Sequence, residues 1–156
     1  MNKKIKIGVV GYSGKSFPIF EASQKIIDAL DEVIQSFRYY DRWNCPRYPS
    51  FEVVSGYTDY GIPALSYAIL NYIVTYREVK CTTTGFAPKE ALSRKRCKVD
   101  KEIIVGENFG DESEAFVDYI DVLIKIGGGE QSIKEFALFN KKKPNNIAIE
   151  KKLIHY

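Results

Sequence analysis

The chain alternates short apolar runs with segments of helical length, and this alternation restricts the folds open to it. Six runs have the length and bounding residues of strands, namely 4–10, 51–56, 78–85, 102–106, 122–129 and 146–150. The connecting segments indicate helices at 18–37, 62–73, 111–120 and 132–140, and a short helix or turn at 87–95. Strands separated by helices form βαβ units with right-handed crossovers. We therefore expect an α/β, Rossmann-like doubly wound fold, with a mainly parallel sheet of about six strands, helices on both faces, and one domain over residues 1–156.

The net charge, the cysteines and the apolar runs limit the binding partners and the cellular compartment that we expect for the chain. The net charge of +3 is mild and lies in scattered lysine and arginine clusters, which is typical of a solvated surface and not of a nucleic-acid interface. The three cysteines match no paired metal-binding spacing and the one histidine is His155, so we expect no metal site. No apolar run approaches the ~20 residues that span a bilayer. We expect a cytoplasmic protein that binds neither nucleic acid nor a membrane.

The turns after the predicted strands are the candidate binding region. Open parallel sheets bind ligands beyond the carboxyl ends of their strands, and glycine there lets a ligand approach the backbone. Gly, Ser and Thr are ordinary residues in any single turn, but five such turns together favour a nucleotide-sized ligand. The candidate binding residues are Gly11, Ser13, Gly14, Lys15, Ser55, Gly56, Asp59, Gly61, Thr84, Glu107, Gly127, Gly128, Gly129, Glu130, Gln131 and Ser132.

The first turn, GVVGYSGKS at 8–16, ends like the phosphate loop of nucleoside triphosphatases but has the wrong spacing. The pattern G-x-x-x-x-G-K-[ST] requires glycine where this chain has Val9. The strand-terminal aspartate that would hold magnesium is also missing, and the glycines do not form G-x-G-x-x-G. Triphosphate hydrolysis is therefore disfavoured. We interpret the turn as offering amides, a hydroxyl and a counter-charge to one phosphate through Gly11, Ser13, Gly14 and Lys15.

The most specific local feature is GGGEQSIKE at 127–135, directly after the fifth strand. Three glycines can seat an anion at the start of the following helix. Ser132 and Glu135 are three residues apart and share one face of its first turn. Glu135 has two possible roles. It can complete a capping box with Ser132, or it can act as a carboxylate beside a ribose, binding hydroxyls or stabilising an oxocarbenium ion.

This segment, with VSGYTDYGIPALSYAI after the second strand, resembles the SLOG superfamily of Rossmann-like domains. The superfamily includes the Lonely Guy phosphoribohydrolases (once misnamed lysine decarboxylases), the molybdenum cofactor carrier proteins and ligand-sensing domains of bacterial defence systems. On the Lonely Guy motif P-G-G-x-G-T-x-x-E, Gly128 and Gly129 match the first two glycines and Glu135 the glutamate, while Ser132 replaces threonine. The proline and the third glycine become Gly127 and Gln131. The second motif of the Lonely Guy enzymes is a Gly-rich turn followed by glycine, a hydrophobic residue, methionine and a helix of small residues. Its matches here are Gly56, Gly61, Ile62 and Ala64, with Pro63 in place of methionine.

One departure from the enzymes of this group bears on function. They carry an Arg-Lys pair on the helix before the fifth strand, and the corresponding segment here, GDESEAFVDYID, has neither residue. The resemblance therefore implies a nucleotide or nucleotide-derived phosphorylated ligand, held by a carrier, sequestering or signalling module with no other cofactor. The alternative is a nucleoside 5′-monophosphate phosphoribohydrolase with Glu135 as catalytic carboxylate. That enzyme would use Asp59 or Glu107 in support and would need Arg94 or Arg96 to reach in from another segment.

Segment 38–50 concentrates aromatic residues, including Tyr39, Tyr40, Tyr48 and the single tryptophan, Trp43. Such a segment can pack over the chain's own core, form a subunit interface, or close over a bound base. We expect the first of these. Domains that resemble this one usually associate, and the predicted helices are apolar enough to do so, so we also expect a homo-oligomer.

Overall fold

Six parallel strands form the central sheet of the computed structural model, which describes residues 3–14 and 16–154. The strands are β1 (Lys4–Gly11), β4 (Ser50–Gly56), β5 (Cys81–Ala87), β6 (Lys101–Ile104), β7 (Val122–Ile126) and β8 (Ala148–Lys151). They lie in the order β6-β5-β4-β1-β7-β8, and every neighbouring pair is parallel. The predicted doubly wound sheet is confirmed.

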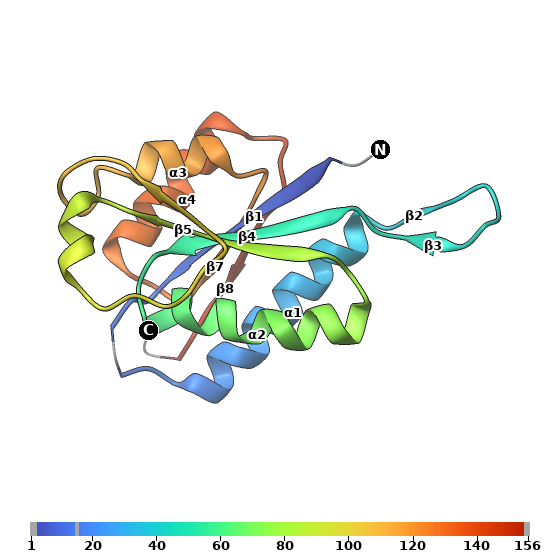
Figure 1. Cartoon of the computed structure of the whole chain (residues 1–156), viewed down its shortest axis with the longest axis horizontal. Coiled ribbons are helices and arrows are strands. Elements are labelled where there is room, and N and C mark those ends of the chain that lie inside the picture. The colour runs from blue at the N-terminus through green and yellow to red at the C-terminus, as the bar shows by residue number, and fades with distance from the viewer. Residues whose placement is uncertain (1–2, 15, 155–156) are drawn as a thin grey trace.

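Helices cover both faces of this sheet, as expected. In Figure 1, α1 (Ile19–Ser36) and α2 (Gly61–Arg77) lie on one face, and α3 (Ser113–Tyr119) and α4 (Glu130–Lys142) lie on the other. A short 3₁₀ helix, η1 (Lys89–Ser93), follows β5. The larger core lies beneath α1 and α2, and a second apolar cluster lies beneath α3 and α4. Burial of one apolar stripe per helix is what holds the layers together.

The strand order reverses between β1 and β7, the two central neighbours. The chain leaves β1 for α1 on one face and leaves β7 for α4 on the other. The carboxyl ends of these two strands therefore open a crevice, because their connections diverge. Any ligand site typical of this fold is expected at that edge.

Most of segment 38–50 is not packed over the core, so that expectation holds only for Tyr48, which packs against the larger core. The segment contains an antiparallel hairpin, β2 (Tyr39–Tyr40) and β3 (Pro46–Arg47), that projects from the body in Figure 1. The Trp43 side chain is 73% exposed and that of Tyr40 is 54% exposed. The hairpin needs no core contact because Asp41 satisfies its tip, accepting hydrogen bonds from the amides of Trp43 and Cys45 and from the guanidinium of Arg47.

Several predicted boundaries shift, and two of the shifts have identifiable reasons. Helix α2 runs on to Arg77, whose guanidinium makes two hydrogen bonds to the carboxylate of Asp31 on α1, and it stops where Glu78 takes a left-handed conformation. Strand β7 stops at Ile126, so the three glycines form a turn and not the end of a strand. The last of them, Gly129, has a φ of 131° and occupies the N-cap position of α4, which starts the helix two residues before Ser132.

Candidate functional site

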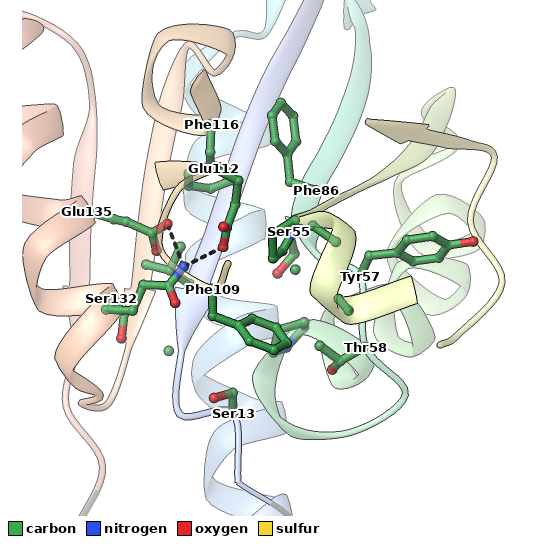
Figure 2. Close-up of a pocket in the computed structure, with 18 of the residues that line it drawn as sticks. Ser13, Ser55, Tyr57, Thr58, Phe86, Phe109, Glu112, Phe116, Ser132 and Glu135 are labelled. Atoms are coloured by element: carbon green, nitrogen blue, oxygen red, sulfur yellow. Dashed lines mark hydrogen bonds between the residues drawn. The ribbon is translucent and has the colours of Figure 1, made fainter. Parts of the chain in front are cut away.

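A pocket of about 300 Å³ lies at the carboxyl ends of β1, β4 and β5 (Figure 2). One wall comes from α3 and α4 and the other from η1 and the turn after β4. Its position at the reversal of strand order is the one that doubly wound folds favour for ligands. The lining residues are Val9, Val10, Gly11, Ser13, Ser55, Gly56, Tyr57, Thr58, Tyr60, Pro63, Phe86, Ala87, Pro88, Ala91, Arg94, Phe109, Glu112, Phe116, Gln131, Ser132 and Glu135.

Part of the predicted site is brought together in this pocket. The predicted residues that line it are Gly11, Ser13, Ser55, Gly56, Gln131, Ser132 and Glu135. Those that lie outside its lining are Gly14, Asp59, Gly61, Thr84, Glu107, Gly127, Gly128, Gly129 and Glu130. Lys15 lies outside the described residues.

The polar residues outside the pocket have partners elsewhere. Glu107 pairs with Lys89 at 3.0 Å, and Asp59 lies 3.9 Å from the Lys95 ammonium. Glu130 is an exposed residue of the first turn of α4 and pairs with Lys134. Thr84 lies within β5 and donates its hydroxyl hydrogen to the buried carboxylate of Glu52. A turn pattern identifies the residues near a strand end, but it does not say which side chains face the pocket.

Two predicted glycines serve close packing around the first turn. A Cβ on Gly11 would lie 2.2 Å from the carbonyl oxygen of Ile126, so a side chain there would push β1 away from β7. Gly61 has a φ of 74°, and a Cβ there would lie 2.7 Å from the Cα of Ser13. The amide of the next residue, Ile62, donates to the carbonyl of Tyr12. These glycines shape the pocket edge by bringing three backbone segments together.

The inner wall of the pocket carries two buried carboxylates joined by one amide. Glu112 precedes the first turn of α3, and Glu135 lies one turn into α4; each is 6% exposed. Figure 2 shows their carboxylates pointing toward each other. The side-chain amide of Gln131 donates to Glu112 at 2.8 Å and to Glu135 at 3.3 Å. Ser113 adds a hydrogen bond to Glu135 at 2.9 Å, so α3 and α4 meet through this cluster.

This setting changes the acidity of Glu135. Loss of water around the carboxyl group raises the pKa of Glu135 to about 7, and the neighbouring Glu112 carboxylate acts in the same direction. Hydrogen bonds from Ser113 and Gln131 oppose the shift without cancelling it. Glu135 therefore changes charge near neutral pH, a property found more often at functional sites than in ordinary helices.

The capping-box role for Glu135 is wrong. Gly129 is the N-cap residue and makes no side-chain cap. The Ser132 hydroxyl donates back to the carbonyls of Gly128 and Gly129 at 3.4 and 3.1 Å, and Glu135 turns away from the helix start to meet Ser113. Glu135 lines the pocket, and its second role, as a carboxylate beside a ligand, stays a prediction.

The opposite wall is aromatic and was not predicted. Phe109 is presented by the turn after β6, where Asp111 accepts hydrogen bonds from the amides of Glu107 and Asn108. The Arg94 guanidinium stacks over the Phe109 ring, 4.8 Å from its centroid. The sequence signal was weak, because GENFGD at 106–111 looks like any surface turn. The other aromatic residues of the lining are Tyr57, Tyr60, Phe86 and Phe116.

Comparisons with known proteins identify the fold. No protein-family model matches the sequence, and no curated protein does. Among solved structures, the molybdenum cofactor binding protein from the phototrophic bacterium Rippkaea orientalis aligns with a TM-score of 0.62 at 20% identity, over 96% of this chain and 78% of that one. The Moco carrier protein from Chlamydomonas reinhardtii aligns with a TM-score of 0.57 at 14% identity, over 96% and 91%. The chain has the fold of the molybdenum cofactor carrier proteins. The structural genomics target TM1055 has the same fold and aligns with a TM-score of 0.60 at 20% identity, over 88% of this chain and 69% of that one.

The fold expected from the SLOG resemblance is thereby confirmed. Across residues 3–14 and 16–154, no helix has the length and apolar content needed to cross a bilayer. In the same residues, no three His, Cys, Asp or Glu side chains are grouped so as to hold a metal ion.

Proposed function

We propose that the chain binds a nucleotide, or a phosphorylated ligand derived from one, in this pocket and acts as a carrier, sequestering or signalling module. The observation that carries the proposal is the composition of the lining: aromatic side chains, two buried carboxylates and two backbone turns meet at the reversal of strand order. Two proteins of the same fold are described as binding or carrying the molybdenum cofactor, which supports a carrier role here.

The pocket offers separate surfaces to the two ends of such a ligand. The flat ring would lie toward Phe86 and Phe116, whose rings pack edge to face at 5.7 Å between centroids. The phosphate would lie toward the turn that carries Ser13 and toward the first turn of α4, where free amides and the helix dipole favour an anion. Arg94 is the one cation among the described lining residues, and it supplies an opposite charge.

Nucleoside 5′-monophosphates should raise the melting temperature of the purified chain. A ligand at 100 times its Kd stabilises the folded state by about 2.7 kcal/mol, which corresponds to roughly 5 to 10 °C for a domain of this size. Differential scanning fluorimetry with adenosine, guanosine, cytidine and uridine monophosphates tests this, with sodium phosphate as the control. Native mass spectrometry of freshly purified protein tests for a retained ligand. No shift with any nucleotide and no retained ligand would contradict the proposal.

The phosphoribohydrolase remains the alternative because Glu135 lies in the pocket with a pKa near 7. A carboxylate of that acidity can serve as an acid or stabilise an oxocarbenium ion. Its partners among the described residues are Ser113 and Gln131, and Arg94 instead stacks on Phe109. Incubation of the purified chain with the same four nucleoside monophosphates decides between the two functions. Release of free base that disappears in Glu135→Gln supports the enzyme, and intact nucleotide after prolonged incubation supports the binding module.

We also propose that copies of the chain associate through the β2–β3 hairpin. Trp, Tyr and Arg are the residues that dominate protein interfaces, and the hairpin exposes Trp43, Tyr40 and Arg42 away from the core. The Arg42 guanidinium stacks on the Trp43 ring at 5.0 Å, which pre-organises both side chains.

Trp43→Ala should weaken self-association by about tenfold or more. Sedimentation equilibrium measures it. Since Trp43 is the single tryptophan, its fluorescence should also shift to shorter wavelength as concentration rises. Ile133→Ala, an exposed apolar change on α4, is the matched control and should leave association unchanged. A chain that stays monomeric at every concentration would rule the interface out.

A further inference from the structure

The inner wall of the pocket presents hydrogen-bond acceptors that lack donors. Glu135 Oε2 accepts from Ser113 and from Gln131, whereas Glu135 Oε1 has no hydrogen-bond partner within residues 3–14 and 16–154. The Gln131 amide nitrogen is committed to Glu112 and Glu135, and its carbonyl oxygen likewise has no donor in the described chain. Glu135 is only 6% exposed and lines the pocket, so a ligand that displaces water from Oε1 has to supply a donor in its place.

The surroundings of these acceptors favour a flat ring over a sugar. Phe116 follows Glu112 by one turn of α3, and Phe86 packs against it from the end of β5. Phe109 lines the same pocket, and the guanidinium of Arg94, another lining residue, stacks over its ring. Rings bury their faces against such side chains, and a planar ligand can bring edge N–H groups to a carboxylate at the same time. A ribose would present hydroxyls, but it would gain little from three phenylalanine rings.

We propose that the pocket selects a heteroaromatic ring carrying a ring N–H beside an exocyclic amino group, as guanine does. This deepens the function proposed above and rests on it. Glu135 Oε1 can accept one hydrogen of that edge, and the carbonyl oxygen of Gln131 can accept the other. Adenine turns a ring-nitrogen lone pair toward the same carboxylate, and hypoxanthine lacks the amino group. Either base leaves the buried acceptor of Glu135 wholly or partly unsatisfied.

Isothermal titration calorimetry with guanosine, inosine and adenosine monophosphates at pH 8 tests this selection. The guanine nucleotide should bind about tenfold or more tightly than the hypoxanthine one, and the adenine nucleotide more weakly still. Glu135→Gln replaces an acceptor oxygen with a donor and should bring the three affinities together. Glu130→Gln, one turn earlier on α4 and exposed, is the matched control and should preserve the preference.

Further measurements distinguish failure of the ring selection from failure of nucleotide binding itself. Equal affinities for the three nucleotides would overturn the selection while leaving nucleotide binding intact, and no binding of any of them would overturn both. Ribose 5-phosphate binding that Glu135→Gln weakens as much as it weakens the guanine nucleotide would place Glu135 on the sugar and contradict the inference. The free ring 2-amino-4-oxopteridine carries the same edge. Its binding without that of the guanine nucleotide would support the edge recognition and assign the ring to a source other than a nucleotide.

Discussion

Glu135→Gln should make the folded chain more stable than the unmodified one at pH 8, by about 3 kcal/mol. The pKa of Glu135 is raised from 4.5 to about 7 by burial in the folded state. The folded chain therefore holds this proton more tightly than the unfolded chain does. The resulting stability is fully present below pH 4.5 and is lost as the pH rises through 7. Glutamine is neutral at every pH, so the variant does not suffer this loss.

Urea denaturation at pH 5 and pH 8 measures the effect. At pH 5 the two chains should differ by less than about 1 kcal/mol, because Glu135 is then protonated in the folded state. Glutamine keeps one oxygen for the hydrogen bonds from Ser113 and Gln131, so the cluster survives the change. Glu130→Gln is the control, since that exposed carboxylate should give a pH-independent difference near zero. Equal stabilities of the Glu135→Gln and unmodified chains at pH 8 would mean that the ionised Glu135 carboxylate does not destabilise the folded chain.

A gain in stability from removing a carboxylate would also say something about the site. Chains rarely keep an unfavourable buried charge unless it contributes to function, and active or binding sites commonly trade stability in this way. A ligand that supplies donors to Glu135 would offset the cost. The stability difference between the two chains should therefore shrink when the ligand is bound.

Phe139→Ala should cost about 3 to 5 kcal/mol of unfolding free energy. The ring is fully buried in the cluster beneath α3 and α4, and its loss leaves a cavity that the sheet cannot collapse to fill. It also removes an anchor of α4, the helix that presents Gln131 and Glu135. We therefore expect ligand binding to weaken even where the chain remains folded.

Phe20→Ala is the control for that change. It removes the same side chain from α1, where the ring is 94% exposed, and should alter stability by less than about 0.5 kcal/mol. Thermal and urea unfolding followed by far-ultraviolet circular dichroism compare the two variants. A similar small loss for both would show that α4 does not depend on Phe139.

Most of the fold was predictable from the sequence, because the hydrophobic pattern of each segment matches the burial of that segment in the folded chain. The run 122–126 is buried at every position, as a central parallel strand requires. The one charged residue of this run, Lys125, can be buried there because its ammonium donates hydrogen bonds to the Gly127 carbonyl and to Glu150. The prediction was wrong for the β2–β3 hairpin because its local pattern and its place in the fold disagree. Its aromatic content suggested burial, whereas hydrogen bonds to Asp41 stabilise it without the core.

The site was predictable in its position but less so in its members. Gly11 and Ser55 lie at the carboxyl ends of β1 and β4, Gln131 lies at the start of α4, and the sheet collects these strand ends at one edge. Glu112 and Arg94 reach the pocket from segments whose placement depends on tertiary contacts, such as the hydrogen bond between Glu112 and Gln131. No local pattern in one sequence encodes a contact of that kind.

The pairing of β1 with β7 also constrains when the molecule can be completed during synthesis. The amide of Lys6 in β1 donates to the carboxylate of Asp121, 115 residues along the chain. At cellular elongation rates, β1 waits on the order of ten seconds for its second neighbour to leave the ribosome. Until then one side of the first strand is an open edge. Because α4 follows β7, a nascent chain gains the inner wall of its pocket only near the end of translation.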